Sequence, residues 1–156
     1  MSSVSSSTYA TMAGIFAGWF ALFGGFVGIV QPSMFFHEKE LSPFYDWLFS
    51  SSAALSLRTT SQKATILGII ELGISLTVLL RSYNILPGPQ NSKQQLHKLP
   101  GLIALTIFYA TDMVGHIVVQ DRLVPIATTL YMCSFTALVN AIVTEGGSNN
   151  KNLKTD

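Results

Sequence analysis

Three ionisable residues, Glu71, Asp112 and His116, lie within long stretches of this chain that are otherwise apolar. A charged side chain at the centre of a lipid bilayer costs at least ~2.5 kcal/mol, and residues of this kind are usually functional or paired. Asp112 and His116 are four residues apart, so a helix places them on one face. Carboxyl and imidazole groups commonly donate and accept protons in enzymes. We therefore take these three residues as candidate catalytic groups of an acid–base relay.

Four apolar stretches, each about as long as a membrane-spanning helix, would have to position these groups. About 20 residues are needed to cross a bilayer, and the stretches are residues 12–30, 64–80, 101–119 and 123–144. Consecutive spans run in opposite directions, so the start of the second and the end of the third share one side of the membrane. Glu71 lies roughly 11 Å from that side at 1.5 Å per residue, Asp112 lies at a similar depth, and His116 lies about one turn nearer the surface. This predicts a polar cavity between the second, third and fourth spans.

Other polar side chains at this depth are candidates for the substrate pocket. They are Tyr109, Ser75, Thr128 and Tyr131. The first loop contains an apolar pattern at near-helical spacing, from Phe44 to Leu57, which is too short to cross the membrane. We expect this segment to form an interfacial helix that covers the cavity.

Two other interpretations of the ionisable residues remain open. In the first, Asp112 and His116 only pair with each other, while Glu71 is neutral and bonded to a hydroxyl group. In the second, the three groups carry protons or ions across the membrane. We predict no metal site, because the spans hold no second histidine and His37 and His97 fall in loops. No cofactor is evident from the sequence.

The composition excludes several classes of protein. Of the 156 residues, 49% are hydrophobic and 11% are charged, whereas a soluble domain carries roughly 25% charged residues. The net charge of +1 argues against a nucleic-acid-binding protein, and a single cysteine, Cys133, argues against a disulfide scaffold. The sequence predicts an all-α fold, a four-span transmembrane helix bundle with an interfacial helix in its first loop.

The chain divides into a polar N-terminal tail over residues 1–11, a transmembrane domain over 12–145 and a disordered C-terminal tail over 146–156. We expect a multi-pass integral membrane protein, with the endoplasmic reticulum as its candidate location. Lysine and arginine are slightly more numerous on the side of the termini, which favours cytoplasmic termini.

The first span has one face made of small residues. They are Gly14, Gly18, Ala21, Gly25 and Gly28. Small side chains allow helix backbones to approach closely in a membrane, so this face predicts a packing seam with another helix, either of the same chain or of a partner or second copy. The opposite face carries bulky residues suited to lipid, which are Phe16, Phe20, Phe23 and Val27.

Two segments, Gly24–Pro32 and Leu67–Gly73, resemble the DoxX-like four-helix membrane proteins. The second helix of that family likewise carries a Gly-x-x-Glu-Leu pattern, which corresponds to Gly68 and Glu71 here. The resemblance implies a four-helix membrane protein. Some members of the family are membrane subunits of quinone-linked oxidoreductases, and many have no assigned activity.

The predicted function is action on a lipophilic small molecule within the membrane. Small four-span proteins of this kind occur beside enzymes of natural-product biosynthesis, so we expect a biosynthetic or tailoring enzyme: an isomerase, a cyclase or an oxidoreductase-associated protein. The alternative is a non-catalytic scaffold or accessory subunit of a biosynthetic or quinone-linked complex. The expected partners are the lipid bilayer, the lipophilic molecule and either a membrane protein or a second copy of the chain. We expect no binding to nucleic acid.

Overall fold

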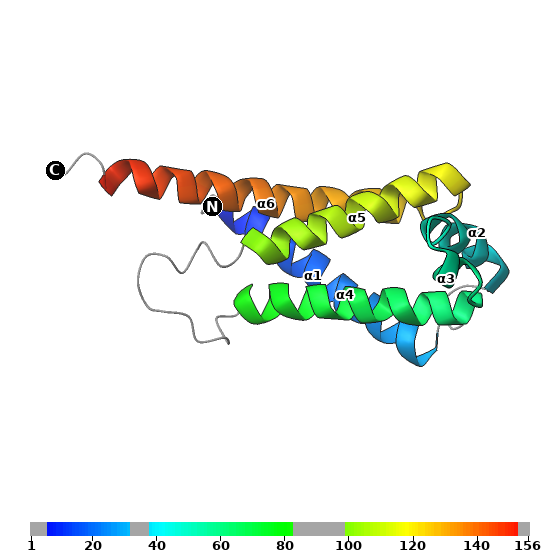
Figure 1. The fold of residues 1–156 in the computed structure, drawn as a ribbon. Coiled ribbons are helices and arrows are strands. Elements are labelled where there is room, and N and C mark those ends of the chain that lie inside the picture. Colours follow the sequence, from blue (N-terminus) through cyan, green and yellow to red (C-terminus); the bar gives the residue numbers. More distant parts are fainter. Residues whose placement is uncertain (1–5, 32–37, 83–98, 153–156) are drawn as a thin grey trace.

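The computed structural model describes the backbone of residues 6–31, 38–82 and 99–152, and within these ranges it contains helices and turns but no strand. Side chains are described for residues 9–31, 42–80 and 99–143. The helices are α1 (Ser6–Val30), α2 (Glu38–Leu48), α3 (Ala53–Ser56), α4 (Thr60–Ser82), α5 (Leu99–Val119) and α6 (Val124–Asn152) (Figure 1). The predicted all-α bundle, with an additional helix in the first loop, is confirmed.

Four of these helices are long and apolar enough to cross a membrane: the qualifying segments are Tyr9–Val30, Thr60–Leu80, Leu99–Val119 and Val124–Val143. Prolines in two of these helices occur where a helix tolerates them. Pro100 and Pro125 are the second residues of α5 and α6, where the missing N–H leaves no intrahelical hydrogen bond unmade. The four helices therefore form a multi-pass membrane bundle.

Helix α1 runs diagonally across the bundle, from α6 near its start to α4 near its end (Figure 1). A Cβ atom built on Gly14 would lie 2.8 Å from Cβ of Ala137 in α6. Near the other end, a Cβ atom on Gly25 would lie 2.8 Å from the carbonyl oxygen of Gly68 in α4, and one on Gly28 would lie 3.1 Å from that of Ala64. The small-residue face is thus used for packing within the chain.

At the end of the bundle away from α2, the long helices lie close together. A Cβ atom on Gly101 of α5 would lie 3.2 Å from the Val78 side chain of α4, and one on Gly18 of α1 would lie 3.5 Å from the same side chain. Towards α2, α1 stays against α4, and α5 continues into α6 through a tight turn. The helices therefore separate at this end in two places. One separation, or seam, lies between α4 and α5, and the other lies between α1 and α6.

Helix α2 fills the seam between α4 and α5 and packs against both of them. Phe44 and Tyr45 are buried in a cluster with Phe49 and with Ala64 of α4. A Cβ atom on Gly115 of α5 would lie 2.6 Å from the Phe44 ring, so this glycine makes room for α2.

The turn between α5 and α6 is a Schellman motif. The N–H of Asp121 donates to the carbonyl of His116 (3.3 Å), and the N–H of Gln120 donates to that of Ile117 (3.3 Å). Gln120 has a φ of 54°, the left-handed conformation in which glycine is usual. This turn brings Asp121 back towards the last turn of α5.

The helices extend further than the predicted spans at both ends of the chain. Helix α1 begins at Ser6, inside the expected N-terminal tail, and α6 continues to Asn152, inside the C-terminal tail that we expected to be disordered. No proline interrupts residues 126–152, and glycine within a helix costs only ~1 kcal/mol relative to alanine. His37, His97 and the remaining parts of the tails lie outside the described residues.

Candidate functional site

A cavity of about 320 Å³ lies at the α2 end of the bundle, with walls from α1, α2, α4, α5 and α6. Most of its lining is apolar or aromatic. The hydroxyl, carboxyl and imidazole side chains that line it are Tyr45, Glu71, Tyr109, Asp112 and His116. The three candidate catalytic residues therefore face one space, to which α4 contributes Glu71 and α5 contributes Asp112 and His116.

The carboxyl group of Glu71 lies against the backbone of α1. A Cβ atom on Gly24 would come within 2.8 Å of Oε1 of Glu71, so the missing side chain of Gly24 provides the space that this carboxyl group occupies. Glu71 also lines the cavity from α4. Its carboxyl group therefore lies between the α1 backbone and the space that a bound molecule would occupy.

The imidazole of His116 is held on three sides. Its Nδ1 atom lies 2.6 Å from Oδ2 of Asp121, its Nε2 atom lies 3.3 Å from Oδ1 of Asp112, and the ring of Phe44 stacks on it with centroids 4.3 Å apart. The shorter contact is in the range of a charge-assisted hydrogen bond, which places the proton of a neutral imidazole on Nδ1. Nε2 is then directed towards Asp112 and can share a proton with it.

Asp121 was not among the site residues predicted from the sequence, and it lies just after the third predicted span, residues 101–119. Besides contacting His116, its carboxylate accepts a hydrogen bond from the N–H of Leu123 (2.8 Å), which fixes its orientation at the start of α6. An aspartate just after an apolar stretch that carries a histidine in its last turn was the available signal. Its contact with His116 depends on the left-handed turn at Gln120, and nothing in the sequence indicates that turn.

Tyr45 is a second functional candidate that the sequence reasoning missed, because it was assigned only to the membrane interface. Its side chain is 9% exposed and lines the cavity from α2. Burial raises the pKa of Tyr45 above its ordinary value, and the negative charges of Glu71 and Asp112 raise it further. The phenol therefore stays protonated and can donate a hydrogen bond.

Of the predicted pocket residues, only Tyr109 lines the cavity. Its hydroxyl donates to the carbonyl of Ala17 (3.0 Å), which ties α5 to α1. Ser75 and Thr128 donate to carbonyls of their own helices, at Leu72 (2.9 Å) and Val124 (2.7 Å). Tyr131 stacks on Phe135, with centroids 5.8 Å apart. The structure thus places Ser75, Thr128 and Tyr131 outside the lining of the cavity.

Helix α1 contributes a wall that the sequence analysis did not include. Phe20, Phe23 and Val27, which we expected to face lipid, line the cavity, although Phe20 and Phe23 are also partly exposed. The reason is the diagonal path of α1, which turns this face obliquely towards α6. Phe16 lies on the same face nearer the start of α1 and remains 53% exposed.

The site combines proton-transferring groups with an apolar enclosure. Within the described residues, no group of three or more His, Cys, Asp or Glu side chains is arranged to hold a metal ion. Comparisons with models of protein families, with curated proteins and with solved structures each found no match. The inference about function therefore depends on the geometry of the cavity.

Proposed function

We propose that this protein is a membrane-embedded enzyme that acts on a lipophilic small molecule by acid–base chemistry. The observation that carries the proposal is that Glu71, Asp112 and His116 face one largely apolar cavity inside a membrane bundle. Ionisable groups within membrane spans are costly and are retained mainly where they act.

The arrangement suits reactions in which a proton is added at one atom of the substrate and removed from another. Glu71 approaches from α4, and the Asp112–His116 pair approaches from α5. In an isomerisation or a cyclisation, one group donates a proton and the other accepts one, so the total number of protons on the protein is unchanged. The accepting group must then return a proton to the donating group before the next cycle. Asp121 acts through His116 and is a positioning residue, and Tyr45 can donate a hydrogen bond to an oxygen of the substrate.

The test begins with deletion of the gene in its host and untargeted profiling of metabolites, followed by return of single variants. We expect a precursor to accumulate on deletion, and we expect Glu71→Gln and Asp112→Asn to leave it accumulated at normal membrane abundance. Thr111→Val is the matched control, because Thr111 is exposed beside Asp112 and bonds only its own helix, at the carbonyl of Ile107. Full product formation by both acid variants would contradict the enzymatic proposal and leave the scaffold alternative.

We also propose that the chain is related to the DoxX-like membrane proteins. Gly68 and Glu71, which carry that resemblance, have distinct uses in the structure. A Cβ atom on Gly68 would lie 2.7 Å from the carbonyl oxygen of Gly25, so Gly68 permits the approach of α1, while Glu71 lines the cavity. A cytoplasmic location of both termini is part of the same proposal, and protease protection of terminal tags in sealed vesicles tests it.

A further inference from the structure

The cavity has one exposed side, and it lies between α1 and α6. The lining residues on this side are themselves accessible from outside the bundle: Phe20 is 39% exposed, Phe23 is 55% exposed and Ile126 is 46% exposed. On the opposite side, Tyr109 and His116 of α5 are at most 4% exposed, and Phe44 of α2, which closes the seam to α4, is 3% exposed.

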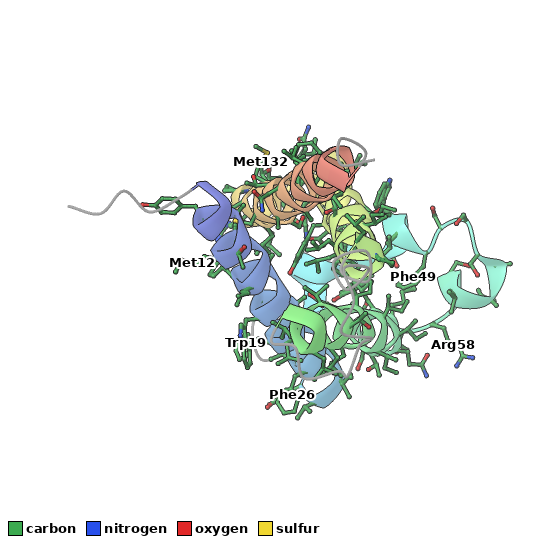
Figure 2. All side chains as sticks on the ribbon, turned by 90° about the vertical axis from the view of Figure 1, so that its left-hand side faces the viewer. Met12, Trp19, Phe26, Phe49, Arg58 and Met132 are labelled. Carbon is green, nitrogen blue, oxygen red and sulfur yellow. The ribbon has the colours of Figure 1, made fainter. Side chains whose placement is uncertain are left out.

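The opening follows from the path of α1. This helix packs closely on α6 near Gly14 and Ala137, and it then runs diagonally towards α4 (Figures 1 and 2). Phe20 lies near the middle of the span Tyr9–Val30. An opening beside the middle of a membrane-spanning helix faces the acyl chains of the bilayer.

The charges of the lining restrict what the cavity can accept. Within the described part of the chain, the lining includes Glu71 and Asp112 but no lysine or arginine. An anionic group such as a fatty-acid carboxylate or a phosphate would meet these acids, and the one imidazole in the lining, His116, is already paired with Asp112 and Asp121. A neutral oxygen, by contrast, can accept a hydrogen bond from Tyr45 or exchange protons with Asp112 and His116.

The volume sets a second restriction. A cavity of about 320 Å³ is at the low end of the range of ~300–1,000 Å³ for small-molecule sites. It suits one chain or ring system and does not accommodate a phospholipid with two acyl chains.

Building on the proposed function, we infer that the substrate is a neutral, oxygen-bearing lipophilic molecule that enters from the bilayer through the opening between α1 and α6. Its apolar body lies against Phe20 and Phe23, and its oxygen points towards Glu71 on α4 and Asp112 on α5. The walls match this orientation, because the aromatic residues stand at the opening, while Asp112 and His116 line the cavity from α5 and Glu71 lines it from α4.

The test uses the purified full-length protein in phosphatidylcholine vesicles and three photoreactive probes with the same diazirine-bearing alkyl chain, ending in an alcohol, a carboxylic acid or an amine. Labelled positions are mapped by mass spectrometry. We expect the alcohol to label the cavity residues Tyr109 and Leu130, which are 1% and 4% exposed, and we expect the acid to label them about tenfold less. Equal labelling by the acid, or stronger labelling by the amine, would overturn the assignment to neutral oxygen compounds.

The route is tested by Ile126→Trp, which adds bulk at the opening. We expect it to reduce labelling of Tyr109 by the alcohol about tenfold, whereas Ile107→Trp should leave it unchanged, because Ile107 is 61% exposed on α5 and does not line the cavity. Ile126→Ala widens the opening from the α6 side and should increase the labelling, so the idea remains testable if Ile126→Trp fails to fold. Unchanged labelling in correctly folded Ile126→Trp and Ile126→Ala would overturn the lateral route.

The two proposals fail in different ways. Labelling of the cavity does not require chemistry, so Glu71→Gln should keep the label while it loses product. Normal product formation by both Glu71→Gln and Asp112→Asn would contradict the enzymatic proposal alone. Absence of cavity labelling by all three probes in the wild-type protein would contradict the binding proposal alone.

Discussion

At the scale of single residues, the site is built around one imidazole. His116 contacts Asp112 at Nε2 and Asp121 at Nδ1, and the Phe44 ring covers one face. A histidine with one nitrogen fixed by a carboxylate presents the other nitrogen in a defined protonation state. The direction of Nε2 towards Asp112 therefore depends on a residue outside the cavity.

Asp121→Asn tests this dependence. An asparagine amide can donate to Nδ1, which moves the imidazole proton to Nε2 and reverses its role towards Asp112. We expect product formation to fall by about 10²-fold, at the low end of what general acid–base catalysis contributes, and its pH profile to shift. Asp121→Glu should restore part of the activity. The measurement is product per unit of membrane protein across pH, and an unchanged profile in Asp121→Asn would contradict the positioning role.

Gly24→Ala tests the place of the Glu71 carboxyl group. The added methyl group would overlap Oε1 of Glu71, which is the movable end of a flexible side chain. We therefore expect product formation to fall about tenfold, while the free energy of unfolding changes by less than about 1 kcal/mol. Gly73→Ala is the control, since a Cβ atom there meets nothing within 4 Å. Equal activity in the two variants would show that the position of Glu71 is unimportant.

Residue spacing predicted part of this site. The separation of Asp112 and His116 is enough to place them on one helix face, and their depth predicted that Glu71 would be near. Asp121 could not be predicted in the same way, because its approach requires a left-handed Gln120. Ser75 and Thr128 were selected by depth alone, and their hydroxyl groups bond to their own helices.

At the scale of the elements, close packing of α1 on α4 determines the shape of the bundle. Gly25→Ala would place a methyl group 2.8 Å from the Gly68 oxygen and 2.8 Å from the Leu72 nitrogen, both of them backbone atoms. The two helices would have to separate, so we expect a loss of about 1–3 kcal/mol of stability. Thermal unfolding in detergent measures it, with Gly73→Ala as the control. A melting temperature equal to that of the control would contradict the close contact.

The ion pair between α2 and α4 predicts a dependence on pH. Nζ of Lys63, which is buried, lies 2.6 Å from Oδ1 of Asp46, and this hydrogen bond holds the pKa of Asp46 below its ordinary value of 3.8. A carboxyl group whose pKa is lowered by folding stabilises the fold above its ordinary pKa, and this contribution is lost as the pH falls through the lowered value. We therefore expect α2 to detach more readily below about pH 4.

Hydrogen exchange of α2 across pH measures this effect, and Asp46→Asn provides the comparison. The variant should show raised exchange in α2 at neutral pH and little further change on acidification. Asp46 itself is largely exposed, so the effect should be local and should leave the four long helices folded. Identical pH dependence in the two proteins would assign the acid sensitivity to another group.

The path of an element is harder to predict than its existence. Uncharged stretches and the small-residue face of α1 predicted four helices and a packing seam. They did not indicate that the small-residue face of α1 would pack against two different helices, with Gly14 against α6 and Gly25 against α4. That division depends on the tilt of α1, which results from the packing of all the helices together.

At the scale of the whole molecule, composition and length were sufficient for the fold class, because a chain with so few charged residues has little alternative to membrane-spanning helices. The cavity could be predicted only in part. Its polar wall followed from residues on α4 and α5, whereas its exposed aromatic side resulted from the separation of α1 and α6. Figure 2 shows the outer surface of these two helices, where Met12, Trp19, Phe26 and Met132 point away from the bundle.

The stacking of Phe44 on His116 connects α2, which covers the cavity, with one of the ionisable residues that line it. An aromatic face attracts a cation more strongly than a neutral ring, so we expect this contact between α2 and α5 to be strongest while the imidazole carries its extra proton. The packing of α2 over the cavity and the protonation of His116 are therefore linked through a single pair of rings.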